Sequence, residues 1–136
     1  RNHGNSADFF LDGRMLPFGR RRAVQHRRGV NVVALDPSAR QVTSISCYDT
    51  STHSAAANAR LSADLDSLPA GHIVLIAVRG SGLDGLDTAA VHALQRVGAS
   101  HALVGDGRPQ EGYALIGSKG GPAVAERRGW SVIVEG

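Results

Sequence analysis

Two runs of apolar residues interrupt the mixed apolar and polar pattern of the chain. Residues 30–35 read Val-Asn-Val-Val-Ala-Leu, and residues 73–78 read Ile-Val-Leu-Ile-Ala-Val. A strand with one face in water alternates apolar and polar side chains, whereas a strand covered on both faces is almost continuously apolar. Both runs therefore predict strands buried on both faces. We expect them to be neighbours at the centre of one sheet.

Further strands are predicted on either side of this pair. Asp36 and Pro37 form a turn after the first run, and residues 42–48 then give a strand that should pair antiparallel with it. Near the N-terminus, Asp-Gly between apolar residues is typical of a tight hairpin, predicted over residues 8–18. The remaining predicted strands are residues 102–104, 113–116 and 130–134.

Two helices are predicted, over about residues 52–68 and 83–97. In the first, leucines recur at helical spacing; in the second, Leu83, Leu86, Ala90, Val91 and Leu94 share one face. The residues at 49–52 all have side chains that can cap the first helix, and Ser81 or a neighbour is expected to cap the second. Gly98 is expected to end the second helix.

Length and composition favour a single domain. The chain has 136 residues, 42% of them hydrophobic, which is enough for one globular core. No apolar run approaches the roughly 20 residues that span a bilayer, so membrane insertion is not expected. Because the chain starts without Met or a signal-peptide pattern, we expect a piece of a processed or longer polypeptide. The expected division is a frayed 1–6, a hairpin at 7–18, a basic segment at 19–28 and a core at 29–136.

The single Cys47 excludes a disulfide within the chain. We expect a buried, unreactive thiol; a bridge to another chain is the alternative.

Positive charge is concentrated in the basic segment, residues 19–28. The net charge is only +3, but this short stretch holds Arg20, Arg21, Arg22, Arg27 and Arg28 beside His26. Such a cluster suits phosphate, sulfate or carboxylate groups, or it is a solvated linker. No aromatic residues are interleaved to stack bases, and neither helix-turn-helix nor zinc-finger spacing occurs. Nucleic acid is therefore not an expected partner.

The glycine-rich stretch 80–85, Gly-Ser-Gly-Leu-Asp-Gly, has the outline of a dinucleotide-binding turn. It follows an apolar strand, precedes a predicted helix and has Asp106 about 20 residues later. Only one such unit occurs, however, and the preceding strands form a hairpin and a meander. A turn before the helix is the favoured interpretation, and nucleotide binding through Gly80 to Gly85 is an alternative.

No other motif in the chain predicts an enzyme. Gly117 to Gly121 fails the P-loop spacing before Lys119, and the six histidines have no metal-ligand spacing. Asp49 and His53 with a nearby serine are better explained as capping residues than as a triad. We therefore expect neither catalysis nor a cofactor or metal.

Taken together, several stretches of the chain resemble the ILEI/PANDER family, named for interleukin-like inducers of epithelial–mesenchymal transition. The matching pieces are Arg28-Gly29-Val30-Asn31-Val32-Val33 through Asp36-Pro37, Tyr48-Asp49-Thr50, Leu68-Pro69-Ala70-Gly71-His72-Ile73-Val74 with Ala77-Val78-Arg79, Leu94 to Gly98-Ala99, and Tyr113 through Pro122. The resemblance implies a compact α/β domain of two small, mainly antiparallel sheets with about two flanking helices. It also implies a non-catalytic domain of the extracellular space or the secretory-pathway lumen.

Family members include secreted cytokine-like proteins, the stem of an O-mannose N-acetylglucosaminyltransferase and domains of cell-surface hyaluronidases. In the glycosyltransferase stem the domain acts as a lectin through two arginines and an aspartate. Arg28 matches the first arginine, with Arg27 beside it; Gly80 replaces the aspartate; and the second arginine falls near Gln110, with Arg108 close by. The resemblance therefore implies a glycan-binding or protein-binding module, with acidic glycans as the expected ligands. It is expected to work within a larger polypeptide or a homo-assembly. A purely structural domain is the alternative.

Overall fold

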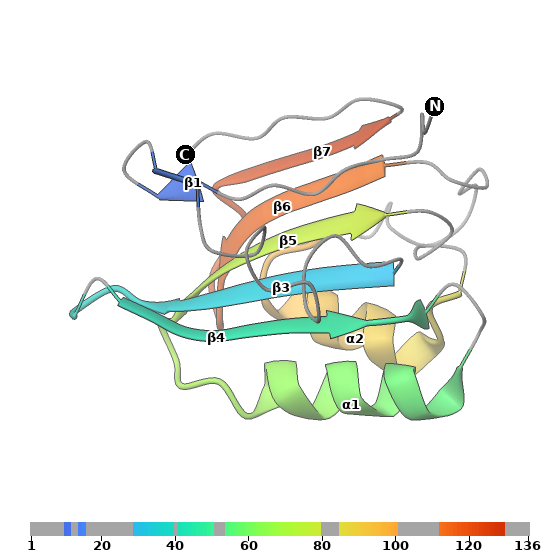
Figure 1. The fold of residues 1–136 in the computed structure, drawn as a ribbon. Helices are drawn as coiled ribbons and strands as arrows, with labels where there is room; N and C mark the ends of the chain where they lie inside the picture. The colour runs from blue at the N-terminus through green and yellow to red at the C-terminus, as the bar shows by residue number, and fades with distance from the viewer. Residues whose placement is uncertain are drawn as a thin grey trace.

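A five-stranded antiparallel sheet, with two helices on one of its faces, forms the body of the molecule (Figure 1). The computed structural model describes residues 10–11, 14–15, 29–39, 41–50, 54–79, 85–100 and 112–129. In sheet order the strands are β4 (Gln41–Tyr48), β3 (Gly29–Asp36), β5 (Ile73–Arg79), β6 (Gly112–Ser118) and β7 (Ala125–Gly129).

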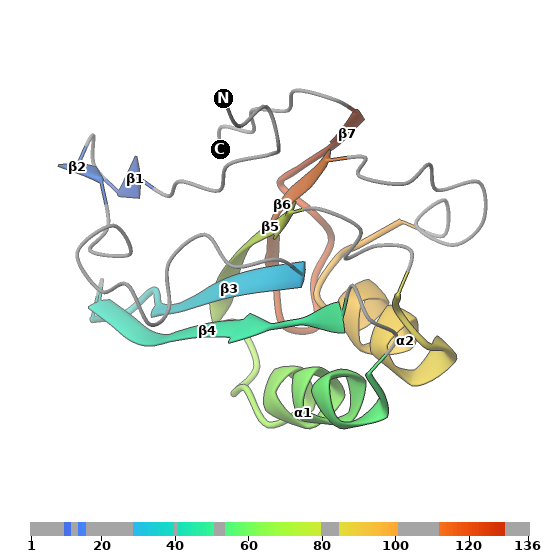
Figure 2. The ribbon, with the colours of Figure 1, turned by 45° about the vertical axis from the view of Figure 1, so that its right-hand side comes forward.

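Helices α1 (Ala55–Asp66) and α2 (Thr88–Arg96) lie side by side on the same face of this sheet (Figure 2). A second, two-stranded sheet pairs β1 (Phe10–Leu11) with β2 (Arg14–Met15) in antiparallel fashion, as the predicted N-terminal hairpin requires. Two antiparallel sheets with two helices confirm the fold class expected from the sequence.

The two apolar runs are neighbouring interior strands, as predicted. β3 pairs antiparallel with β5 over its length, from Gly29 opposite Arg79 to Leu35 opposite Ile73. Seven of the eight residues of β3 are buried, which explains why the run is apolar without alternation. β4 pairs antiparallel with the outer side of β3, also as predicted.

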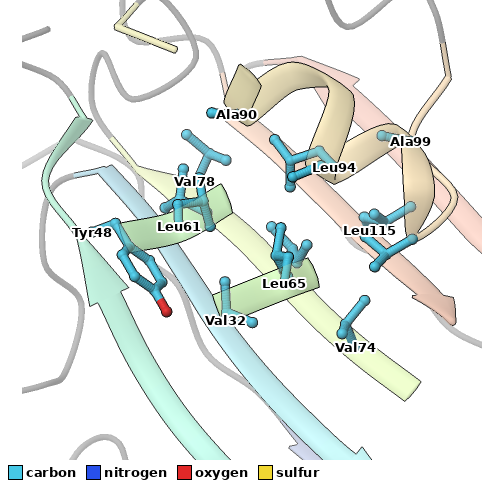
Figure 3. Packing of buried hydrophobic residues seen from close by; sticks show 14 of the residues in the cluster. Val32, Tyr48, Leu61, Leu65, Val74, Val78, Ala90, Leu94, Ala99 and Leu115 are labelled. Atoms are coloured by element: carbon cyan, nitrogen blue, oxygen red, sulfur yellow. The ribbon is translucent and has the colours of Figure 1, made fainter. Parts of the chain in front are cut away.

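Alternate residues of the central strands build two separate hydrophobic cores. Val32 on β3 and Val74 on β5 face the helices and pack with Leu61, Leu65 and Leu94 (Figure 3). Val33, Leu35 and Leu75 are buried on the opposite face of the sheet. Both faces of β3 and β5 are therefore covered.

Both helices begin later than predicted. The N-cap of α1 is Ser54, whose Oγ accepts a hydrogen bond from the Ala57 amide at 3.1 Å, and not one of residues 49–52. The N-cap of α2 is Asp87, whose carboxylate accepts from the Ala90 amide at 2.9 Å, and not Ser81. In each case the sequence offers several residues able to cap, and the tertiary fold selects one that lies later than predicted.

Leu86 precedes α2 and still packs against the helix-side core, so an apolar pattern extended the predicted helix too far. Gly98 ends α2 as predicted, with φ of +116°. A Cβ at this position would also lie 2.8 Å from the amide nitrogen of Ala123.

Strand β7 was not predicted, because Ala-Glu-Arg-Arg-Gly has neither apolar alternation nor β-prone residues. The predicted strands at 102–104 and 130–134 lie outside the described residues, as do the segments 1–6 and 19–28. Cys47 lies on β4 and is half-buried rather than fully buried. Among the described helices, neither is long and apolar enough to cross a membrane.

Candidate ligand-binding end of the sheet

The predicted site positions adjoin strand ends that lie side by side. Gly29 at the start of β3 is paired with Arg79 at the end of β5, and Gly112 at the start of β6 is paired with Gly129 at the end of β7. Because Val78 pairs with Tyr113, β5 ends beside the start of β6. These termini form the end of the sheet to which the arrowheads of β4, β5 and β7 point in Figure 1. We call it the candidate end.

The four candidate ligand residues themselves lie outside the described residues: Arg27, Arg28, Arg108 and Gln110. Arg28 immediately precedes β3, and Gln110 is two residues before β6. Gly80, the position where the lectin has its aspartate, directly follows β5. The register therefore brings the backbone that leads into these three positions to one end of the sheet.

Gly29 fixes the backbone that follows Arg28. Its φ is +105°, a conformation that residues with a side chain rarely adopt. A Cβ at this position would also lie 2.0 Å from the carbonyl oxygen of Tyr48 and 2.8 Å from Cα of Asp49. The start of β3 therefore lies so close to the end of β4 that only glycine fits at position 29. This contact fixes where β3 begins in the sheet.

Asn58 holds the connection between β5 and α2 in place. This polar side chain of α1 is 1% exposed. Its Nδ2 donates to the carbonyl oxygens of Ser54 at 2.9 Å and Gly85 at 3.0 Å, and its Oδ1 accepts from the amide of Asp87 at 3.0 Å. Since a buried amide is stable only when it is hydrogen-bonded, the network ties α1 to residues 85–87, which lead into α2. No sequence pattern indicates this network, because a single Asn in a helix is usually exposed.

Two charged side chains of α1 contact Tyr48, the last residue of β4. The Tyr48 hydroxyl donates to Oδ2 of Asp64 at 2.5 Å, and the Arg60 guanidinium lies 5.2 Å from the centre of the Tyr48 ring. Burial of the phenol, reinforced by the hydrogen bond to Asp64, raises the pKa of Tyr48 to about 12. The hydroxyl is therefore protonated at neutral pH and acts as a donor that fixes β4 to α1.

Lys119 organises the opposite end of the sheet. Its Nζ donates to the carbonyl oxygens of Leu65, Asp66 and Leu68, at 3.1, 2.7 and 3.2 Å. These carbonyls end α1, so the ammonium group caps the helix C-terminus and opposes its dipole. The Ser-Lys-Gly-Gly stretch is thus a structural turn, consistent with its failure to match a P-loop.

An ion pair joins the two helices at the same end. Nε of Arg96 lies 2.9 Å from Oδ1 of Asp66, and Nη2 of Arg96 donates to Oδ2 of Asp66 at 2.9 Å. The hydrogen bond from Arg96 holds the pKa of the Asp66 carboxyl below its ordinary value. Both side chains are close to half exposed, so the pair contributes little stability.

The fold removes the main support for a dinucleotide site at residues 80–85. Such sites lie where adjacent parallel strands diverge at their carboxyl ends. Here β5 and β6, which precede and follow α2, are antiparallel neighbours. Moreover, α2 begins at Thr88, after the glycine-rich stretch. Within the described residues no group of three or more histidine, cysteine, aspartate or glutamate side chains is arranged to hold a metal ion.

Comparison with known proteins identifies the family of the chain. A search of curated proteins found no relative of the chain. The family model of the interleukin-like EMT inducer, ILEI, matches residues 28–121, well over half of the chain. This range starts at Arg28 and includes β3 to β6, both helices and the Lys119 turn. The chain therefore belongs to the ILEI family.

Proposed function

We propose that this domain is a non-catalytic extracellular module that binds acidic glycans through the candidate end of the sheet. The observation that carries the proposal is the pairing of Gly29 with Arg79 beside the start of β6. This register brings the approaches to Arg28, Gly80 and Gln110 together, and these are the positions to which the lectin site of a family member corresponds.

The chemistry of these positions favours an anionic ligand. Glycine at position 80 offers no carboxylate to accept hydrogen bonds from neutral sugar hydroxyls. Arg27, Arg28 and Arg108 offer guanidinium groups, which bind sulfate and carboxylate with paired hydrogen bonds. Sulfated uronic-acid polymers of the extracellular matrix carry both sulfate and carboxylate groups. The same surface would serve a protein partner with clustered carboxylates.

A glycan array that includes sulfated and uronic polymers tests this proposal. We expect retention on the acidic polymers and weaker or no retention on neutral glycans. Replacing Arg28 with Ala should weaken binding to chondroitin sulfate about 10- to 100-fold, because a charged hydrogen bond contributes about 1.5–3 kcal/mol. Calorimetric titration measures this change.

Arg96→Ala is the matched control, because it removes one positive charge at the opposite end of the sheet. Its affinity should stay near that of the original chain. Equal losses in the two variants would show that binding follows net charge alone. Failure of the array to detect any glycan would favour a structural or assembly domain without a sugar ligand.

A further inference from the structure

Glu126 on β7 accepts two hydrogen bonds that join three parts of the chain. Its Oε2 accepts from the backbone amide of Ser100 at 3.0 Å and from the hydroxyl of Tyr113 at 2.6 Å. Ser100 follows α2, and Tyr113 is the second residue of β6. Hydrogen bonds to a carboxylate are shorter and stronger than bonds between neutral groups. One carboxylate oxygen therefore holds the chain on both sides of the connection from α2 to β6, residues 101–111.

The packing after α2 agrees with these bonds. Ala99 is 7% exposed and belongs to the helix-side core. It lies on the same side of the sheet as Leu115, the residue of β6 with which Glu126 pairs (Figure 3). The next residue, Ser100, is exposed, so packing does not hold it. Its amide bond to Glu126 attaches the chain to β7 at the point where residues 101–111 begin.

This connection contains two of the four candidate ligand residues, Arg108 and Gln110. It begins after Ser100 and ends at Gly112, which pairs with Gly129 at the candidate end. A segment held at both ends loses less conformational freedom when a ligand orders it, so its residues bind more tightly. Hydrogen bonds from a neighbouring element commonly supply such support. Here the supporting element is β7, which contains no candidate ligand residue.

We propose that Glu126 is a positioning residue for ligand binding, because it attaches both ends of residues 101–111 to β7 and so restricts Arg108. The inference rests on the proposed function of the candidate end. Glu126 is not itself a ligand contact, and its negative charge is unfavourable for an acidic glycan. Its contribution through hydrogen bonds therefore has the opposite sign to the contribution of its charge.

Two substitutions of Glu126 separate these contributions. Glu126→Gln and Glu126→Ala both remove one negative charge, but only glutamine keeps an oxygen that accepts from Ser100 and Tyr113. If charge alone governed binding, both variants would bind chondroitin sulfate more tightly than the original chain. We expect Glu126→Gln to bind at least as tightly. Glu126→Ala should bind roughly 3- to 10-fold more weakly in calorimetric titration, because binding must then order a freer segment.

Tyr113→Phe tests the same support without a change of charge. It removes one of the two donors that hold the Glu126 carboxylate. Affinity should fall by about two- to threefold, because the bond from Ser100 remains. Tyr48→Phe is the matched control, since the Tyr48 hydroxyl also donates to a carboxylate, that of Asp64. It should change glycan affinity by less than about twofold.

Hydrogen exchange measures the positioning directly. In Glu126→Ala the Ser100 amide loses its acceptor, so its exchange should quicken at least about tenfold. The amides of residues 101–111 should exchange faster as well. These amides should keep their original rates in Glu126→Gln and in Tyr48→Phe. Amides of β3 should keep their rates in Glu126→Ala, which shows that this variant is folded.

The outcomes distinguish this inference from the proposed function. If Glu126→Ala binds the glycan as tightly as the original chain or more tightly, the inference is overturned and the proposed function stands. Unchanged exchange of Ser100 and the residues after it would also overturn the inference alone. An original chain that binds no acidic glycan would overturn both.

Discussion

Asn58 is the residue whose replacement should most clearly reveal how the β5–α2 connection is held. Replacing Asn58 with Ala removes three hydrogen bonds, to the Ser54 and Gly85 carbonyls and from the Asp87 amide. Each bond contributes about 1 kcal/mol net, and leaving a buried partner unsatisfied adds a further cost. Because Asn58 is 1% exposed, water cannot replace the lost partners without opening the structure. We expect a loss of about 4 kcal/mol in the free energy of unfolding.

Urea unfolding followed by circular dichroism measures this loss. For a chain of this length, 1 kcal/mol corresponds to roughly 3–5 °C in Tm, so melting should fall by roughly 12–20 °C. Hydrogen exchange of the Asp87 amide adds a local readout, since this amide donates directly to Asn58. Its protection should drop more than that of amides in β3.

Asn58→Asp refines the test. Aspartate keeps an acceptor for the Asp87 amide but faces the Ser54 and Gly85 carbonyls with oxygen in place of a donor. It should be less stable at pH 7 than at pH 4, where protonation restores one donor. Ala59→Ser, at an exposed position of the same helix, is the control and should change stability by less than about 0.5 kcal/mol. An Asn58→Ala variant as stable as this control would refute the account of how the connection is held.

Two further outcomes concern the core and the alkaline limit of stability. Val33 is fully buried on β3, between β4 and β5. Replacing Val33 with Asp should lower the free energy of unfolding by at least about 3 kcal/mol, because it buries an unpaired charge. An unchanged melting curve would contradict the position of Val33 in the core. The folded-state pKa of Tyr48, about 12, exceeds its ordinary value of 10.0, so its stabilising effect is full below pH 10 and is lost as pH rises through 12. Chemical denaturation between pH 10 and 12 should therefore show a decline that Tyr48→Phe lessens, and parallel declines in the two proteins would contradict this assignment.

The central strands could be predicted because burial on both faces leaves a local signature. Apart from Asn31, residues 30–35 and 73–78 are apolar without alternation, and the structure pairs them at the centre of the sheet. Strand β7 has no such signature. Its charged residues form a strand because Gly112–Ile116 of β6 offers an open edge, and pairing with this edge is a tertiary effect. The helix starts were misplaced for a similar reason, because choosing Ser54 or Asp87 as the cap depends on how each helix packs.

For the candidate end, the sequence predicted which residues to consider. It did not predict the contacts that hold the neighbouring described backbone. Arg28 was identified by resemblance, whereas Gly29 beside it is required by its contact with the Tyr48 carbonyl. Asn58 could not be predicted, since its partners Gly85 and Asp87 are 27 and 29 residues away along the chain. Supporting hydrogen bonds of this kind depend on three-dimensional proximity, and a single sequence does not report it.

Part of the family-matching sequence makes structural contacts at the end of the sheet opposite the candidate end. Lys119 caps α1 beyond the end of β6, and Gly117 lies so close to the Val97 carbonyl oxygen that a Cβ would be 1.9 Å from it. These constraints are internal to the fold and apply whatever the domain binds. Arg28 and Gly80 adjoin the other end, where an exchange of side chains need not disturb those contacts. Membership of the ILEI family therefore fixes the architecture, while the ligand must be found by experiments directed at the candidate end.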